Sequence, residues 1–207
     1  QRWPQAGILG VDSSAEMLAK ARSDHPQVNF VQAEIATWRP NRPVDVIYSN
    51  AAMHWISDHD AVFPRLLSEL SPGGWLAIQM PHNFDAPSHT CVIDTIEQGL
   101  WRAKLEPHLR RAPVAAPHHY WRLLNGKCAR LDIWECEYLQ VLEGANPVAE
   151  FVKGSWLKQF LDRLEEPERG AFEEDYRARV RRAYPPEAGG HTLFVFRRLF
   201  IVAQRAA

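Results

Sequence analysis

The segment "GILGVDSSAEML", residues 7–18, combines a short apolar strand with the start of a helix. Residues 6–11 are mostly apolar and include β-branched side chains, a composition that favours a buried strand. Ser13 and Glu16 have the spacing of a capping box, which predicts that a helix begins directly after Asp12. The segment therefore places an acid at the carboxyl end of a strand, where ligands bind in open α/β sheets.

Strands and helices alternate through the first half of the chain. Further strands are predicted over residues 28–32, 44–49 and 75–80. Between the last two, Ser57 and Asp60 form a second possible capping box before a helix with apolar residues at i, i+3, i+4 and i+7. Such alternation is typical of βα units and a mostly parallel sheet.

The second half has a different organisation. A helix is predicted over residues 88–105, and strands are predicted over residues 131–142 and 192–203. Two helices, each with one apolar face, are predicted between these last strands, so we expect a helical lid over residues 146–189. The predicted α/β core then comprises residues 1–145 and 190–207.

The composition excludes some classes of function. The chain has 24 Lys and Arg against 25 Asp and Glu residues, which argues against a general nucleic-acid or membrane-surface binder. Its three cysteines lack CxxC spacing and favour a reducing, cytoplasmic compartment. No apolar run approaches the length of a membrane span, and no His, Cys or Asp cluster has the spacing of metal ligands. We therefore predict no metal site, and the oligomeric state stays open.

Three polar positions follow consecutive predicted strands. Asp12 could hold ribose hydroxyls or merely assist a helix cap, and Glu34 could bind an adenine amino group or be a solvated loop acid. Asn50 precedes two small residues that allow close approach to a ligand or, alternatively, tight packing beneath a helix. Because all three fall on one edge of a parallel sheet, together they indicate a nucleoside site.

These stretches carry a family resemblance. "GVDSSAEMLAKAR", "FVQAEIATW", "DVIYSNAAMHW" and "LSPGGWLAI" resemble the successive motifs of class I S-adenosylmethionine-dependent methyltransferases. "YSNAAMHWISDH", "QMPHNFDAPSH" and "FRRLFIVAQR" look more narrowly like the trans-aconitate 2-methyltransferases, which esterify a small organic acid. The resemblance implies a Rossmann-like α/β sheet with helices on both faces and a helical lid inserted before the last strand.

S-adenosylmethionine is the cofactor that the resemblance implies. The implied cofactor-binding residues are Asp12, Ser13, Met17, Glu34, Ile35, Asn50, Ala51 and Trp55. The family places a first strand and a glycine-rich loop before the ribose acid, a unit of about 30 residues. Only eleven residues precede Asp12, and none of the eleven glycines has GxG spacing. We therefore expect a chain without the first strand and without half of the cofactor site.

The implied substrate is a small carboxylic acid, with trans-aconitate favoured. A carboxylate is already ionised at neutral pH, so no general base is required and the protein's task is positioning. The candidate substrate-binding residues are His54, His82, Asn83, His118, Tyr120, Lys158 and Arg198. Each candidate has a structural alternative, and a lone histidine is usually a surface residue or a core residue with satisfied hydrogen bonds. Lys158 stands where the resemblance leads us to expect an arginine, which weakens the assignment of this particular acid.

Other functions compete with this interpretation. A methyltransferase of the same fold could act on another small molecule, or the fold could serve as a non-catalytic binding module. The absent glycine loop favours the binding module, whereas the joint presence of Asp12, Glu34 and Asn50 favours an enzyme. An NAD-dependent oxidoreductase is disfavoured because its dinucleotide loop would also be expected.

Overall fold

The computed structural model describes residues 4–207, and its first elements form a small parallel unit. Strands β1 (Leu9–Asp12) and β2 (Asn29–Gln32) pair in parallel and are connected by helix α1 (Ala15–Asp24). The cap of α1 is Ser14, whose hydroxyl accepts the Met17 N–H at 3.2 Å. The helix therefore begins one residue later than the Ser13 capping box predicted, because the Asp12 carboxylate accepts the Ser14 N–H at 2.8 Å and turns the chain first.

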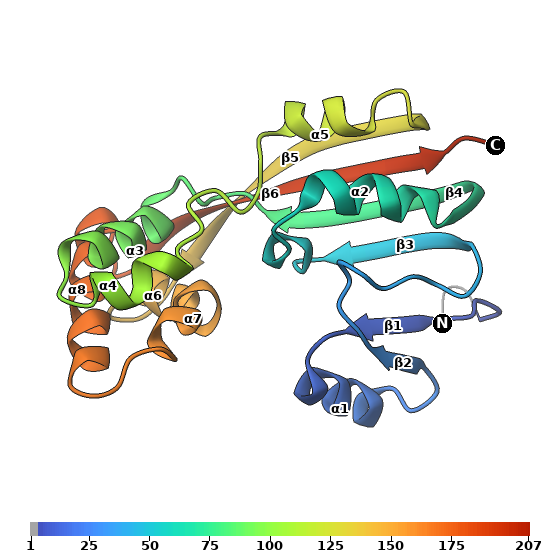
Figure 1. Cartoon of the computed structure of the whole chain (residues 1–207). Coiled ribbons are helices and arrows are strands. Elements are labelled where there is room, and N and C mark those ends of the chain that lie inside the picture. Colours follow the sequence, from blue (N-terminus) through green and yellow to red (C-terminus); the bar gives the residue numbers. More distant parts are fainter. Residues whose placement is uncertain (1–3) are drawn as a thin grey trace.

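A four-stranded sheet follows, in the order β3-β4-β6-β5 (Figure 1). Strands β3 (Val44–Asn50) and β4 (Leu70–Pro81) are parallel, whereas β6 (Thr192–Arg205) runs antiparallel to β4 and to β5 (Cys128–Leu142). Within residues 4–207, no strand pairing joins this sheet to the β1–β2 pair. The sheet is mixed, and only its β3–β4 half has the parallel arrangement that the alternating pattern predicted.

One face of the four-stranded sheet carries the main core. Leu76, Ile78 and Met80 of β4 are buried on this face, where helices α2 (His59–Ser68) and α5 (Pro117–Leu124) pack. The cap of α2 is Asp58, which accepts the Ala61 N–H at 3.0 Å, and not the predicted Ser57. Register puts Val46, Tyr48 and Trp134 on the opposite face, where they are exposed. Gln79 belongs to that second face.

A helical lobe lies beyond the carboxyl ends of β3 and β4 (Figure 1). Its elements are α3 (Pro87–Gln98), α4 (Arg102–Leu105), η2 (Glu106–His108), α6 (Pro147–Val152), the π-helical turn η3 (Lys153–Leu157), α7 (Lys158–Leu161) and α8 (Glu168–Ala183). The helix predicted over residues 88–105 is interrupted at Gly99. None of the helices described here is both long and apolar enough to cross a membrane.

The lobe is built from two separate segments of chain. The Tyr176 hydroxyl of α8 donates to the Ser88 carbonyl of α3 at 2.9 Å, and Trp101 packs edge-on against Phe172. The predicted lid of residues 146–189 corresponds to α6–α8, and the packing joins α3 and α4 to it. Its definition as a separate domain stays a prediction.

Candidate functional site

The loop after β1 presents the first predicted site residues. Asp12 and Ser13 are exposed at the carboxyl end of the strand, and Met17 is 56% exposed on the first turn of α1. The Gln32 side-chain amide donates to the Ser13 carbonyl at 3.0 Å and ties this loop to β2. The Asp12 carboxylate is fixed by its bond to the Ser14 N–H and is still accessible to a ligand.

The loop after β2 is held from the side by α2. Arg65 donates one N–H to the Trp38 carbonyl at 2.8 Å and another to the Ile35 carbonyl at 2.5 Å. Glu34 is exposed at the start of this loop, and the half-buried Ile35 packs against the main core. The guanidinium of Arg65 therefore determines where Glu34 and Ile35 lie, a role that no sequence motif indicated.

A strained turn follows β3. Ala51 has a φ of 52°, the one positive φ outside glycine among residues 4–207. Its N–H donates to the Gln79 carbonyl of β4 at 3.0 Å, which holds the turn in place. Left-handed backbone in a residue other than glycine costs about 1–3 kcal/mol and is concentrated at functional sites. The turn directs the chain from Asn50 into the short helix η1 (Met53–Trp55).

Arg110 fixes η1 from outside. Its guanidinium donates to the carbonyls of His54 at 3.0 Å, Trp55 at 3.1 Å and Ile56 at 2.8 Å. Three bonds from one planar fork are a geometry that arginine can supply and lysine cannot. Sequence reasoning missed Arg110 because it lies in the irregular segment before α5, far from any motif.

Tyr120 supports the site and does not line it, which corrects the prediction that it binds substrate. It is fully buried on α5, and burial raises the pKa of its hydroxyl to about 12. The His59 Nε2 lies 2.8 Å from the Met53 carbonyl and must donate there, so the Tyr120 hydroxyl donates to His59 Nδ1 at 2.7 Å. Tyr120 thus holds His59, which in turn holds η1.

Tyr120→Phe should therefore affect stability more than ligand binding. The substitution leaves His59 Nδ1 and the Ala115 N–H without the hydroxyl that pairs with both, at a cost of about 1–3 kcal/mol in the free energy of unfolding. Urea denaturation measures this loss. Calorimetry with the predicted carboxylic acid substrate should give a Kd within threefold of wild type. A large rise in Kd at unchanged stability would restore Tyr120 to the binding site.

A cavity of about 430 Å³ lies between the ends of β3 and β4 and the helical lobe. The sheet side supplies Asn50, Ala51, His54, Trp55, Gln79, Pro81, Phe196 and Arg198, and the lobe side supplies Phe84, His89, Phe151, Val152, Gly154, Ser155 and Trp156. Trp55 stacks on Trp156 with ring centroids 5.5 Å apart, so aromatic contact joins the two sides. Part of the lobe side comes from the turn η3, and π-helical turns are frequent at functional sites.

The cavity collects buried polar atoms that have no hydrogen-bond partner. Among the described residues, such atoms occur in His54 (Nδ1), Gln79 (both amide atoms), Asn83 (both amide atoms) and Arg198 (Nε). Three of these four residues line this one cavity. Because a buried unpaired polar group costs about 1–3 kcal/mol, this concentration points to a polar ligand.

Two histidines of the cavity are held in the neutral form. Burial, reinforced by the positive charge of Arg110, lowers the pKa of His54 to about 4. Burial also lowers the pKa of His89 to about 4, and its Nδ1 lies 3.0 Å from the Ser88 hydroxyl. At neutral pH both side chains therefore offer hydrogen bonds without charge.

Arg198 supplies the positive charge of the cavity. Its guanidinium lies over the rings of Tyr138 and Phe196, with its carbon 5.2 and 5.3 Å from the ring centroids. Its neighbour Arg197 points to the opposite face of β6, where it pairs with Asp85 and donates to the His82 carbonyl at 2.7 Å. The alternation of a strand thus separates two adjacent arginines into different environments.

The other predicted substrate residues lie outside the cavity lining. His82 pairs with Glu135, and His118 is exposed on α5. Asn83 is buried next to the lining residue Phe84. Lys158 is exposed and pairs with Asp162 at 2.6 Å, one helical turn away. Neither its position nor its partner supports the predicted contact with substrate.

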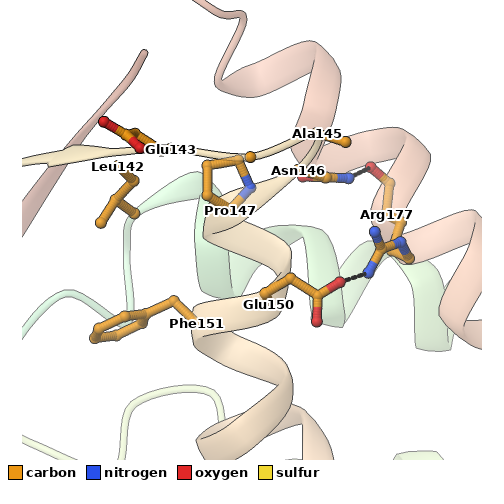
Figure 2. A pocket seen from close by; sticks show the side chains of 9 residues that line it. Leu142, Glu143, Ala145, Asn146, Pro147, Glu150, Phe151 and Arg177 are labelled. Atoms are coloured by element: carbon orange, nitrogen blue, oxygen red, sulfur yellow. Dashed lines mark hydrogen bonds and ion pairs between the residues drawn. The ribbon is translucent and has the colours of Figure 1, made fainter. Parts of the chain in front are cut away.

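A second cavity of about 360 Å³ lies beside the start of α6 (Figure 2). The cation among its described lining residues is already neutralised, because Arg177 pairs with Glu150 and contacts Glu173 at 3.8 Å. The Asn146 amide donates to the Arg177 carbonyl at 2.8 Å. Unlike Arg198, the guanidinium here already has carboxylate partners, so the first cavity is the better candidate for an anionic ligand.

Comparison with known proteins gives consistent matches. Residues 1–74 match the family model described as "Methyltransferase domain". The chain is 45% identical over 205 residues to trans-aconitate 2-methyltransferase of Azoarcus sp., covering 99% of this chain and 80% of that protein. It is 43% identical over 204 residues to the enzyme of the same name from Rhizobium rhizogenes, covering 98% of this chain and 80% of that protein.

Solved structures agree on the fold. The YcgJ protein from Bacillus subtilis matches with a TM-score of 0.59 at 15% identity, covering 99% of this chain and 85% of that one. Haemonchus contortus phosphoethanolamine N-methyltransferase 2, solved in complex with phosphomonomethylethanolamine and S-adenosylhomocysteine, matches with a TM-score of 0.52 at 14% identity. That match covers 97% of this chain and 44% of the larger protein.

Proposed function

The chain belongs to the trans-aconitate 2-methyltransferase family, and we propose that it transfers the methyl group of S-adenosylmethionine to one carboxylate of trans-aconitate. The charge of the cavity carries this proposal. Among the described residues that line it, Arg198 is charged, none is Asp or Glu, and the two histidines are neutral. Guanidinium groups bind carboxylates through charge-assisted hydrogen bonds, so the cavity suits an anionic acid.

The residues at the strand ends fit the cofactor. Asp12 is fixed yet exposed after β1, Glu34 is exposed after β2, and the Asn50–Ala51 turn opens onto the cavity. In our proposal Asp12 binds the ribose hydroxyls and Glu34 the adenine amino group. Ser13 belongs to the Asp12 loop, Met17 and Ile35 pack against the adenine, and Trp55 lies where the cofactor meets the acid.

The reaction requires positioning more than proton transfer. S-adenosylmethionine supplies the methyl group: an O–CH₃ bond forms while the CH₃–S bond breaks, and its electron pair stays on sulfur. The acid is ionised at neutral pH, so no residue has to remove a proton. In this proposal the chain would position one carboxylate oxygen for attack on the methyl group, and Trp156, buried and stacked on Trp55, would shield it from water.

The decisive experiment for this function is a methyl-transfer assay with the full-length natural protein. Trans-aconitate, cis-aconitate and citrate are supplied in turn with S-adenosylmethionine, and methyl esters are identified by mass spectrometry. We expect the trans-aconitate ester to form with the highest kcat/KM. If no ester forms from any of these acids, the proposal is refuted.

A cytoplasmic location, which the few unpaired cysteines favour, belongs to the same proposal.

Asp12→Ala should weaken cofactor binding. The substitution removes the proposed acceptor for two ribose hydroxyls, and hydrogen bonds to a charged group are worth about 1.5–3 kcal/mol, so the Kd for S-adenosylhomocysteine should rise roughly 10- to 100-fold. Calorimetry measures this Kd directly. The matched control is Asp24→Ala, which removes an exposed acid at the end of α1 that pairs with Lys20. Equal effects of the two substitutions would exclude the ribose contact.

A further inference from the structure

Gln79 has no part in the function proposed above, yet it lines the cavity and both of its amide atoms are buried without a hydrogen-bond partner. The residue is 5% exposed, and β4 places it on the same face as Asn50, its register partner on β3. Its carbonyl accepts the N–H of the strained Ala51 at 3.0 Å. Gln79 therefore lies directly beside the turn that we assign to the cofactor.

The positive charge of the cavity lies at the other end. Gln79 is opposite Phe200 on β6, and Arg198 lies two residues before Phe200 on the same face, opposite Pro81. The rings that hold the Arg198 guanidinium, Tyr138 and Phe196, lie beyond it, away from Gln79. The groups near the turn, Gln79 and His54, are uncharged at neutral pH. The cavity thus has one charged end and one neutral end.

Esterification treats the carboxylates of a polyacid differently. The carboxylate that accepts the methyl group loses its negative charge, whereas the others keep theirs. A guanidinium on the reacting group would stabilise the ionised reactant more than the transition state and so slow the reaction. A neutral amide N–H can position the same carboxylate and lowers the reaction rate much less, because it stabilises the ionised reactant less strongly than a guanidinium does. A guanidinium is best placed on a carboxylate that does not react.

We propose that Gln79 binds and positions the carboxylate that is methylated, while Arg198 anchors a carboxylate that keeps its charge. The inference rests on the proposed function and extends it to the choice of the reacting group. Gln79 is then the residue that determines the position of the ester in the product. His54, from η1, lines the same neutral end.

The test is the position of the ester formed by Gln79→Met. Methionine has a similar length and no polar atoms, so it removes two unpaired buried groups, and the unfolding temperature should not fall. Wild-type protein should convert trans-aconitate to a single monomethyl ester. Gln79→Met should give a mixture of positional monoesters by NMR, with kcat/KM lowered about 10-fold. The Kd for trans-aconitate without cofactor should rise by a similar factor.

Gln140→Met is the matched control. Gln140 is a partly buried glutamine on β5 that does not line the cavity, so its replacement should give the wild-type ester. A single ester at the wild-type position, formed by Gln79→Met with kcat/KM within threefold of wild type, would overturn the inference. Absence of any ester from the wild-type protein would instead refute the proposed function, which keeps the two failures distinguishable.

Discussion

Arg198→Gln should lower kcat/KM for trans-aconitate by roughly 100- to 1,000-fold, because it removes the positive charge that lines the cavity. Removing one partner of a buried, hydrogen-bonded charge pair costs about 2–5 kcal/mol, and most of that cost should be seen in binding. Calorimetry without cofactor should therefore show a rise in Kd of the same order. The readouts are steady-state methyl transfer and this Kd.

Arg198→Lys separates charge from geometry. Lysine keeps the positive charge but loses both the planar fork and the stacking on Tyr138 and Phe196. We expect kcat/KM to fall about 10-fold, between wild type and Arg198→Gln. If lysine were as damaging as glutamine, the guanidinium would act mainly by packing and not through its charge.

Arg197→Gln is the matched control for both variants. Arg197 is adjacent in sequence but points to the opposite face of β6, where its partner Asp85 is largely exposed. Exposed ion pairs contribute about 0–1 kcal/mol to stability, so this variant should remain folded with kcat/KM within threefold of wild type.

A monocarboxylic acid such as crotonate gives a second control, because it has no second carboxylate for Arg198. Arg198→Gln should then cost at least 10-fold less with crotonate than with trans-aconitate. Equal losses with both acids would contradict the anchoring role.

The residues that sequence reasoning placed well lie at strand ends. Asp12 ends β1, Asn50 ends β3 and Glu34 follows β2, and the apolar patterns of these strands are local. Parallel pairing brings the ends of β1 and β2 to one edge, whereas an edge shared with β3 stays a prediction, because within residues 4–207 no strand pairing joins β1–β2 to the four-stranded sheet. Their contacts with the cofactor stay predictions. Arg197 and Arg198 both interrupt an apolar strand, which indicated that at least one of them faces the site, and the structure places Arg198 in the cavity lining and Arg197 on the opposite face.

The lobe side of the cavity could not be predicted in this way. Phe84, His89 and Trp156 come from three elements whose packing depends on long-range contacts between α3, η3 and α8. Lys158 shows the converse error, because helical spacing could not reveal that its side chain pairs with Asp162 on an exposed surface. Gln79 did carry a signal, since it is a polar residue inside the apolar run "WLAIQMP" of residues 75–81.

Acidification from pH 7 to pH 5 should destabilise the fold by about 4 kcal/mol, chiefly through His54 and His89. Burial lowers the pKa of each from 6.5 to about 4, so in this range the unfolded chain binds protons that the folded chain does not. The free energy of unfolding therefore falls as pH drops below 6.5, and the loss continues until the folded pKa near 4 is reached. The lowered pKa of His59, also caused by burial, acts in the same direction.

Urea denaturation at pH 5, 6, 7 and 8 measures this dependence. Between pH 7 and pH 8 the two histidines are neutral in the folded chain and mostly neutral in the unfolded chain, so their contribution should change by only about 0.3 kcal/mol and that interval serves as an internal control. His89→Gln removes one titrating group and should reduce the loss between pH 7 and pH 5 by about 2 kcal/mol. His54→Gln should do the same, because its imidazole is buried at the same cavity. An unchanged loss in both variants would mean that other groups govern the acid sensitivity and that the cavity histidines are not held neutral by burial.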